Sequence, residues 1–168
     1  MPFQNYSSKY EDDLPVHYDI STDLNLVTYI CSGSVTAAKF FETGDKVTLD
    51  PRLQQKTSVI IDFYLAEIDI VVSDLRFAIE KMKETKRKGQ EVRTAVLTKS
   101  TSLKFLADAL QLMTAESPFD FHICNTEKDA IHWLGLPEEE TLLFWMATRK
   151  SALKQTPSKI DAYPFASI

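Results

Sequence analysis

The segment that most constrains the fold is KTSVIIDFYLAEIDIVVSDL, at residues 56–75. Its first half, SVIIDF at 58–63, is an unbroken apolar run, which is typical of a strand buried on both faces. After it, apolar residues recur at helical spacing: Ile68, Val71, Val72, Leu75, Ala78, Ile79 and Met82. The segment therefore predicts a buried strand, a short acidic turn, and a helix that begins at Asp69 with Asp69 as its N-cap.

Two further strand-and-helix units follow this segment. VRTAVL at 92–97 reads as a strand, and one of Ser100, Thr101 and Ser102 can cap the helix after it. That helix is expected to turn these residues inward: Leu103, Leu106, Ala109, Leu110 and Met113. FDFHIC at 119–124 alternates as a half-buried strand does, and Thr126 with Asp129 can form a capping box. Strands that alternate with helices predict a parallel sheet with right-handed crossovers.

The first part of the chain predicts a β-hairpin, with strands at 17–21 and 26–32 and a turn at 22–25. A weaker helix follows at 36–47 and is interrupted by Gly44. The fold class expected is therefore α/β: a mixed, mostly parallel sheet with an N-terminal β-hairpin, β-α repeats and an extra C-terminal helix. The length of 168 residues suits one domain with tails. We expect a flexible arm at 1–15, an α/β domain at 16–136, a helix at 137–154 and an extended tail at 155–168.

The last helix is apolar around most of its circumference, in the stretch TLLFWMA at 141–147. One stripe can pack on the domain: Leu142, Trp145, Met146 and Leu153. Leu143 and Phe144 then need another partner. We therefore expect a homodimer, with Leu143, Phe144 and Trp145 as its candidate face.

Composition narrows the class of protein. The formal net charge of −5 argues against a nucleic-acid binder, which needs a basic face to displace counterions. No apolar run approaches the length of a membrane span, and the N-terminus lacks the features of a signal peptide. Cys31 and Cys124 each lie in an apolar run and read as buried free thiols in a reducing compartment. We expect a soluble cytoplasmic protein.

The sequence predicts no catalytic set and no cofactor site. It has no Gly-rich phosphate loop and no nucleophile elbow. Asp62, Glu67 and Asp69 can bind a cation or form an acid-base pair, although such acids more often cap helices and solvate turns. The metal candidates, His122, Cys124 and His132, lack an evident fourth ligand, so no metal is expected.

Ligands of open α/β sheets gather at the carboxyl ends of the strands. The candidate partner or ligand face at that edge comprises Asp62, Asp69, Ser73, Ser100 and Thr126. A second possibility is an apolar pocket. Its lining would come from the aromatic residues, which otherwise build the core and a dimer face: Phe40, Phe41, Phe63, Tyr64, Phe105, Trp133, Phe144 and Trp145.

Three stretches carry a family resemblance over residues 26–136. These are SVIIDF with the helix after it, VRTAVLTKSTSLKFLADAL, and FDFHICNTEKDAIHWL. Together they resemble the SpoIIAA-like branch of the STAS domains, which is grouped with CRAL-TRIO-type lipid-binding folds. The resemblance implies a non-catalytic regulatory or protein-interaction module, with a protein partner or a second copy bound. The alternative it implies is a small carrier or sensor of a hydrophobic, lipid-like molecule.

One stretch departs from the family pattern. In anti-sigma factor antagonists, a serine in an Asp-Ser-Ser-Gly type of turn is phosphorylated. The matching stretch here is DIVV at 69–72, and Ser73 lies one turn further on. The resemblance therefore does not extend to phosphorylation at that position.

Overall fold

The computed structural model describes residues 15–116 and 119–155. The expected flexible arm, apart from Pro15, and the expected tail, apart from Gln155, lie outside the described residues. Along the chain the elements are β1 (Val16–Ser21), β2 (Leu26–Thr36), α1 (Ala37–Leu49), β3 (Lys56–Asp69), the 3-10 helix η1 (Val72–Asp74), α2 (Leu75–Arg87), β4 (Glu91–Leu97), α3 (Thr101–Met113), β5 (Phe121–Cys124), α4 (Glu127–Leu134) and α5 (Glu138–Lys154).

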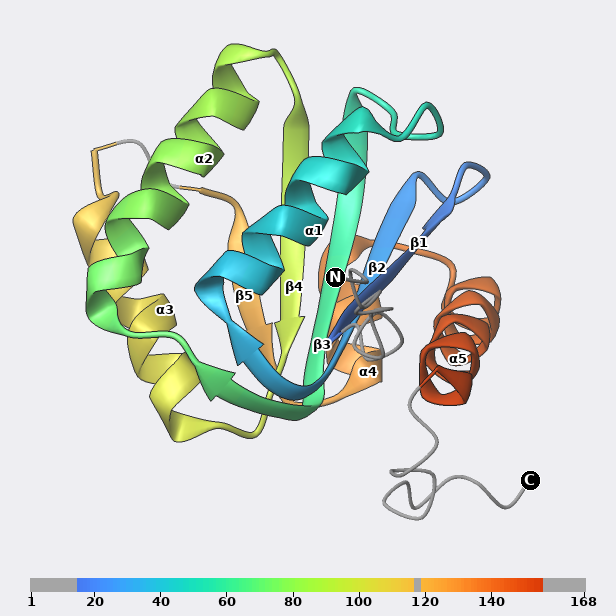
Figure 1. Ribbon diagram of the computed structural model, residues 1–168. Coiled ribbons are helices and arrows are strands. Elements are labelled where there is room, and N and C mark those ends of the chain that lie inside the picture. Colours follow the sequence, from blue (N-terminus) through green and yellow to red (C-terminus); the bar gives the residue numbers. More distant parts are fainter. Residues whose placement is uncertain (1–14, 117–118, 156–168) are drawn as a thin grey trace, which may run out of the picture.

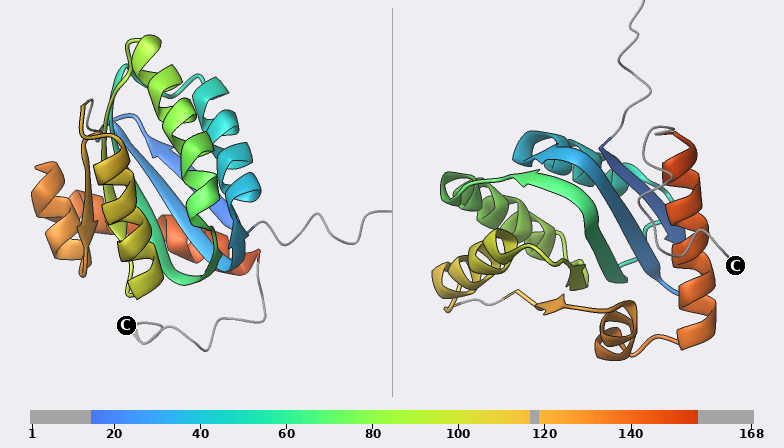
Figure 2. Two further views of the ribbon diagram at one scale, coloured as in Figure 1. Left: turned by 90° about the vertical axis from the view of Figure 1, so that its left-hand side faces the viewer. Right: turned by 90° about the horizontal axis from the view of Figure 1, so that it is seen from below.

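Within the described residues, five strands form one mixed sheet in the order β1-β2-β3-β4-β5. β1 and β2 are antiparallel and form the predicted hairpin, and the remaining neighbours pair in parallel. This arrangement confirms the α/β class and the mostly parallel sheet. Helices α1, α2 and α3 cover one face of the sheet, and α4 and α5 cover the other (Figures 1 and 2).

The two faces of the sheet build two separate cores. Alternate residues of the central strands face opposite sides, as strand geometry requires. Val27, Tyr29 and Phe63 belong to the core under α1, α2 and α3. Leu26 and Ile60 belong to the core under α4 and α5. Because both faces are covered, these strands read in the sequence as continuous apolar runs.

Helix α1 is continuous from Ala37 to Leu49, so the predicted interruption at Gly44 is wrong. Thr36 caps the helix by accepting a hydrogen bond from the backbone N–H of Lys39 at 3.3 Å. A mid-helix glycine costs up to about 1 kcal/mol. Packing of Phe40 and Val47 against the sheet core compensates for that cost.

Strand β3 is longer than predicted, and the helix expected to begin at Asp69 begins at Leu75. The reason is nonlocal: β2 continues to Thr36 and pairs with β3 as far as Asp69. Ile68 and Ile70 then alternate onto the core, with the period of a strand. The apolar residues after Phe63 fit the period of a helix and that of a strand, and pairing with β2 selects the strand.

The residues between β3 and α2 also differ from the prediction. Val71 and Val72, expected to face the core, are exposed. Asp69 is the last residue of the strand and not an N-cap. Asp74 takes the position before α2, and its carboxylate accepts a hydrogen bond from the backbone N–H of Val71 at 2.9 Å.

Ser100 and Thr126 are the N-caps of the later helices as predicted, although no bond from the Asp129 side chain completes the predicted capping box within the described residues. Ser100 Oγ accepts from the N–H of Leu103, and Thr126 Oγ1 accepts from the N–H of Asp129. The inward faces of these helices differ from the prediction. Met113 and Met146, predicted to face inward, are exposed. The buried stripe of α5 is Thr141, Trp145, Thr148 and Ala152. No helix in the described part of the chain is long and apolar enough to cross a membrane.

Candidate ligand-binding pocket

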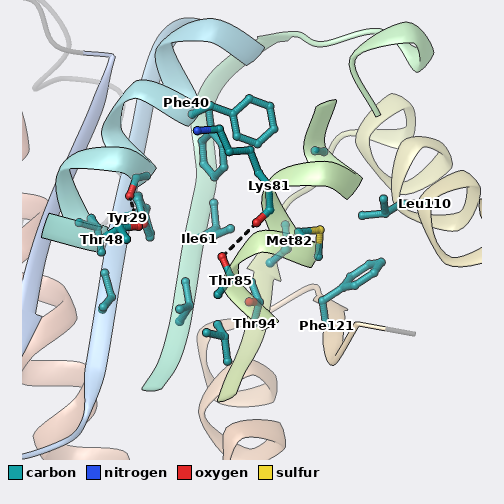
Figure 3. A pocket seen from close by; sticks show the side chains of 18 of the residues that line it. Tyr29, Phe40, Thr48, Ile61, Lys81, Met82, Thr85, Thr94, Leu110 and Phe121 are labelled. Atoms are coloured by element: carbon teal, nitrogen blue, oxygen red, sulfur yellow. Dashed lines mark hydrogen bonds between the residues drawn. The ribbon is translucent and has the colours of Figure 1, made fainter. Parts of the chain in front are cut away.

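An apolar pocket of about 360 Å³ lies between the sheet and helices α1, α2 and α3 (Figure 3). Its floor is made by every second residue of four strands that pair in parallel, because these side chains share one face of the sheet. The residues are Val27 and Tyr29 from β2, Thr57, Val59, Ile61 and Phe63 from β3, Val92, Thr94 and Val96 from β4, and Phe121 and Ile123 from β5. The floor is therefore apolar along most of its length.

The helices close the pocket from above. Phe40, Phe41 and Gly44 line it from α1, and Ala78 and Met82 line it from α2. Helix α3 contributes Leu103, Leu106, Ala107 and Leu110. The small residues at positions 44, 78 and 107 leave the space that larger side chains would fill. A Cβ added at Gly44 would meet no atom within 4 Å.

A chain of aromatic rings forms the α1 side of the pocket. The ring centroids of Tyr29 and Phe40 are 5.7 Å apart, and those of Phe40 and Phe63 are 5.9 Å apart. Phe41 contacts Phe77 of α2 edge to face at 5.0 Å. Burial raises the pKa of Tyr29, so its hydroxyl stays neutral. Among the aromatic residues considered in the sequence, Phe40, Phe41 and Phe63 line this pocket.

The remaining aromatic residues lie elsewhere. Tyr64, Trp133, Phe144 and Trp145 pack with the second core, under α4 and α5. Phe105 is exposed.

Two ion pairs lie at the rim of the pocket. Lys81 Nζ is 2.8 Å from Asp45 Oδ1 and joins α2 to α1. Lys88 Nζ is 2.9 Å from Glu84 Oε1 within the end of α2. The hydrogen bond to Asp45 raises the pKa of Lys81, and the bond to Lys88 lowers the pKa of Glu84. These charges therefore balance each other locally.

The predicted ligand face at the strand ends is only partly assembled. Asp62 of β3 stands opposite Leu97, and Leu97 stands opposite Cys124, so β4 and β5 end beside Asp62. Ser100 and Thr126 follow at that edge as helix caps. Asp69 ends the extension that β3 shares with β2 alone, and Ser73 lies beyond it in η1. The structure therefore places Asp62, Ser100 and Thr126 near one edge, and Asp69 and Ser73 apart from it.

The carboxylate of Asp62 is buried and fully engaged. Its Oδ2 accepts from Trp145 Nε1 at 3.1 Å and from Arg149 Nε at 2.6 Å, and its Oδ1 accepts from the backbone N–H of Tyr64 at 3.0 Å. With 1% of the residue exposed, Asp62 offers no oxygen to a cation or a substrate. The role observed for Asp62 is to hold α5 against the sheet.

Further polar contacts surround this edge. Arg149 Nη1 donates to Glu127 Oε1 at 2.8 Å, and the hydroxyl of Tyr64 donates to the backbone carbonyl of Asn125. Lys99 Nζ lies over the ring of Tyr64, 4.9 Å from its centroid. Burial raises the pKa of Tyr64. These contacts stabilise the second core.

The candidate dimer face is divided by the structure. Trp145 is 1% exposed and packs within its own chain, so it does not lie on an exposed surface. Phe144 is half-buried in the same core, and Leu143 is exposed. Leu143 thus remains as the exposed member of the three.

The metal candidates do not converge. His122 stacks on Trp133 with centroids 5.4 Å apart, and Cys124 is buried. Across residues 15–116 and 119–155, no three His, Cys, Asp or Glu side chains are grouped so as to hold a metal ion.

Comparison with family models and with curated proteins finds no match. Among solved structures, the chain is similar to an uncharacterised protein of the DUF3478 family from Shewanella loihica PV-4, which has a SpoIIAA-like fold. That match has a TM-score of 0.45 and 16% identity, over 71% of this chain and 91% of the other. The chain is also similar to the anti-sigma factor antagonist SpoIIAA in its unphosphorylated form, with a TM-score of 0.45 and 15% identity, over 71% and 97% of the two chains. This likeness is one of fold and says nothing of what this chain binds.

The sequence predicts an apolar pocket as one possibility but does not locate it. Thr57, Thr94 and Gly44 are not among the residues predicted to line it. The signal for them was faint: two threonines in phase with apolar residues on adjacent strands, and a glycine on the apolar face of a helix. Their convergence depends on strand pairing and helix placement, which no local pattern encodes.

Proposed function

We propose that this protein is a non-catalytic binding module that takes up an apolar small molecule in the pocket under α1, α2 and α3, as a carrier or sensor. The pocket itself supports the proposal. Its volume of about 360 Å³ falls within the range of roughly 300–1,000 Å³ that is usual for small-molecule sites. Its lining is largely aliphatic and aromatic, with a few polar groups, as in such sites.

The strand-end edge supports a ligand role less well. Asp62 is saturated by hydrogen bonds within the chain, and Ser100 and Thr126 cap helices. The non-catalytic part of the proposal depends on the same observations, since a general base needs an accessible atom near a substrate.

Native mass spectrometry of gently purified protein, compared before and after solvent extraction, tests this proposal. We expect a mass above that of the chain, lost on extraction. The extracted protein should then bind the neutral fluorescent probe N-phenyl-1-naphthylamine. In Gly44→Phe the added Cβ meets no atom within 4 Å, so the ring should occupy the pocket, and binding should be lost while the fold persists.

Ala38→Phe is the matched control, because position 38 is exposed on the same helix. It adds the same ring outside the pocket and should bind like the wild type. Equal binding by the wild type and Gly44→Phe, or no binding by the wild type, would contradict the proposal.

A second candidate function, self-association as an interaction module, is favoured by the surface of α5. Leu143 and Met146 are 63% and 55% exposed and lie three residues apart, so they share one side of the helix. We propose that this side contacts a second copy of the chain. Sedimentation equilibrium should show a dimer for the wild type and a monomer for Leu143→Glu. Ser151→Glu serves as the control for charge alone, because it adds the same charge at an exposed position about 80° and 140° around the helix from Leu143 and Met146. A monomeric wild type would refute this second proposal.

A further inference from the structure

The polar side chains of the pocket gather at one end. Thr57 begins the floor on β3 and stands beside Val92 of β4, and Thr94 follows Val92 on the same face. Thr85, near the end of α2, lines the same pocket from the opposite side (Figure 3). The side chain of Gln55 bonds the carbonyl of Gly89 at 3.2 Å and ties the end of α2 to the start of β3. These three hydroxyls therefore belong to the amino-terminal end of the strands.

The other end of the pocket is apolar in its walls. Phe63 and Ile70 line it from β3 and just after it, and Leu75 and Leu103 line it from the starts of α2 and α3. The one acid there, Asp74, already accepts a hydrogen bond from Val71. The pocket is thus polarised along the strands, with hydrogen-bonding groups at the amino ends and hydrocarbon toward the carboxyl ends.

The hydroxyls differ in what they have left to offer. Thr57 Oγ1 donates to the carbonyl of Gln54 at 2.7 Å, and Thr85 Oγ1 donates to the carbonyl of Lys81 at 3.1 Å. Because each hydroxyl proton is already used in one of these bonds, the oxygen can only accept a hydrogen bond from a ligand. The half-buried hydroxyl of Thr94 makes no hydrogen bond to any described residue. It can therefore either donate or accept. These three hydroxyls together match a ligand group that donates.

The charges of the lining disfavour an anionic head group. The charged residues of the lining are Asp45, Asp74, Lys81, Glu84 and Lys88. Both lysines form ion pairs, with Asp45 and Glu84, and the third acid leaves the lining with a net charge of one negative. A carboxylate or phosphate would add negative charge to a lining that already has one negative charge in excess. A cation at the hydroxyl end would have to displace a lysine from Asp45 or Glu84, because Asp74, the acid without a lysine, lies at the other end of the pocket.

We propose that the ligand is an uncharged amphiphile with a hydroxyl head. The hydroxyl lies among Thr57, Thr85 and Thr94, and the hydrocarbon chain runs toward Phe63 and Leu103. This inference rests on the function proposed above. It places the head group at the end of the sheet opposite to the strand-end edge where ligands of open α/β sheets usually bind.

Four eight-carbon probes test the inference: 1-octanol, octane, octanoate and octylamine. Each is used to displace N-phenyl-1-naphthylamine from extracted wild-type protein and from Thr94→Val. We expect 1-octanol to bind most tightly. In Thr94→Val its affinity should fall roughly fivefold, the effect of losing one neutral hydrogen bond. The affinity for octane should stay within about twofold, because the replacement keeps the shape of the side chain.

Thr28→Val is the matched control. Thr28 is a buried threonine in the same sheet, its hydroxyl lacks a partner among the described residues, and it faces the other core. Its replacement should change none of the four affinities. Thr57→Val tests a second hydroxyl, on β3, and should also lower the affinity for 1-octanol.

The outcomes distinguish the hydroxyl head group from the proposed function, which is that the pocket binds an apolar molecule. Tightest binding of octanoate or octylamine would overturn the hydroxyl head, as would equal losses of 1-octanol and octane in Thr94→Val. In either case the pocket would still be a ligand site. Failure of all four probes and of the dye to bind the wild type would overturn both proposals together.

Discussion

Arg149 Nε lies 2.6 Å from Asp62 Oδ2, although the two residues are 87 positions apart in the chain. Their side chains are 12% and 1% exposed. Trp145, one turn before Arg149, donates to the same carboxylate oxygen. A buried carboxylate in the central strand thereby fixes both the position and the rotation of the last helix. That rotation explains why Met146 faces outward and Trp145 does not.

Replacing Arg149 should therefore destabilise the protein strongly. Arg149→Met leaves the carboxylate of Asp62 buried without its cation, and breaking a buried pair in this way typically costs about 3–5 kcal/mol. Urea denaturation measures the free energy of unfolding. Lys56→Met is the control, because Lys56 pairs with Glu91 on the surface and should cost less than about 1 kcal/mol. Similar losses in the two variants would contradict the role assigned to Asp62.

Gly44→Ala should stabilise the protein by about 0.5–1 kcal/mol, because alanine restricts the unfolded chain and favours the helix. The new methyl group meets no neighbour within 4 Å. Gly135→Ala is the matched opposite case. Gly135 ends α4 with φ of 70°, where a side chain is strained, so the same substitution should destabilise by roughly 1–2 kcal/mol. Thermal unfolding should shift in opposite directions for the two variants.

Asp50 should make stability depend on acid pH. Hydrogen bonds from Arg52, with a further one from Tyr18, lower the pKa of Asp50 to about 2. The unfolded chain should have a pKa near about 3.9. A lowered pKa in the folded state means that the stabilisation is present above about pH 4 and is lost as the pH falls toward 2.

Denaturation of the wild type and Asp50→Asn over a series of pH values tests this dependence. The difference in unfolding free energy should shrink within that window and stay constant above it. A difference that does not change with pH would show that Asp50 acts through packing alone.

Both thiols should be inert in the folded protein. Burial raises the pKa of Cys31 well above its ordinary value and raises that of Cys124 to about 11. Little thiolate therefore forms near neutral pH. Ellman's reagent should react slowly with native protein and stoichiometrically with two thiols after unfolding in urea. Rapid reaction of native protein would mean that one of the strands carrying these cysteines opens readily.

Sequence patterns predicted those features that depend on neighbouring residues. The hairpin of β1 and β2 follows from two short strands with a four-residue turn, and the caps at Ser100 and Thr126 follow from hydroxyls just before apolar helical stripes. The mostly parallel sheet follows from the alternation of strands and helices. A helix cap joins residues only three positions apart, and the side-chain periods of strands and helices are 2 and 3.6 residues. Both depend on nearby residues alone, so the sequence by itself determined them.

The tertiary structure decided what depends on distant partners. β3 runs to Asp69 because β2 offers backbone groups that far, and the competing helical spacing gives way. Asp62 holds α5 against the sheet because the packing of α5 places Arg149 beside its carboxylate. The pocket exists because α1, α2 and α3 meet the sheet through small residues such as Gly44, leaving Thr94 and its neighbours uncovered. Such contacts depend on how whole elements pack in space, and this packing is not contained in the pattern of any one segment.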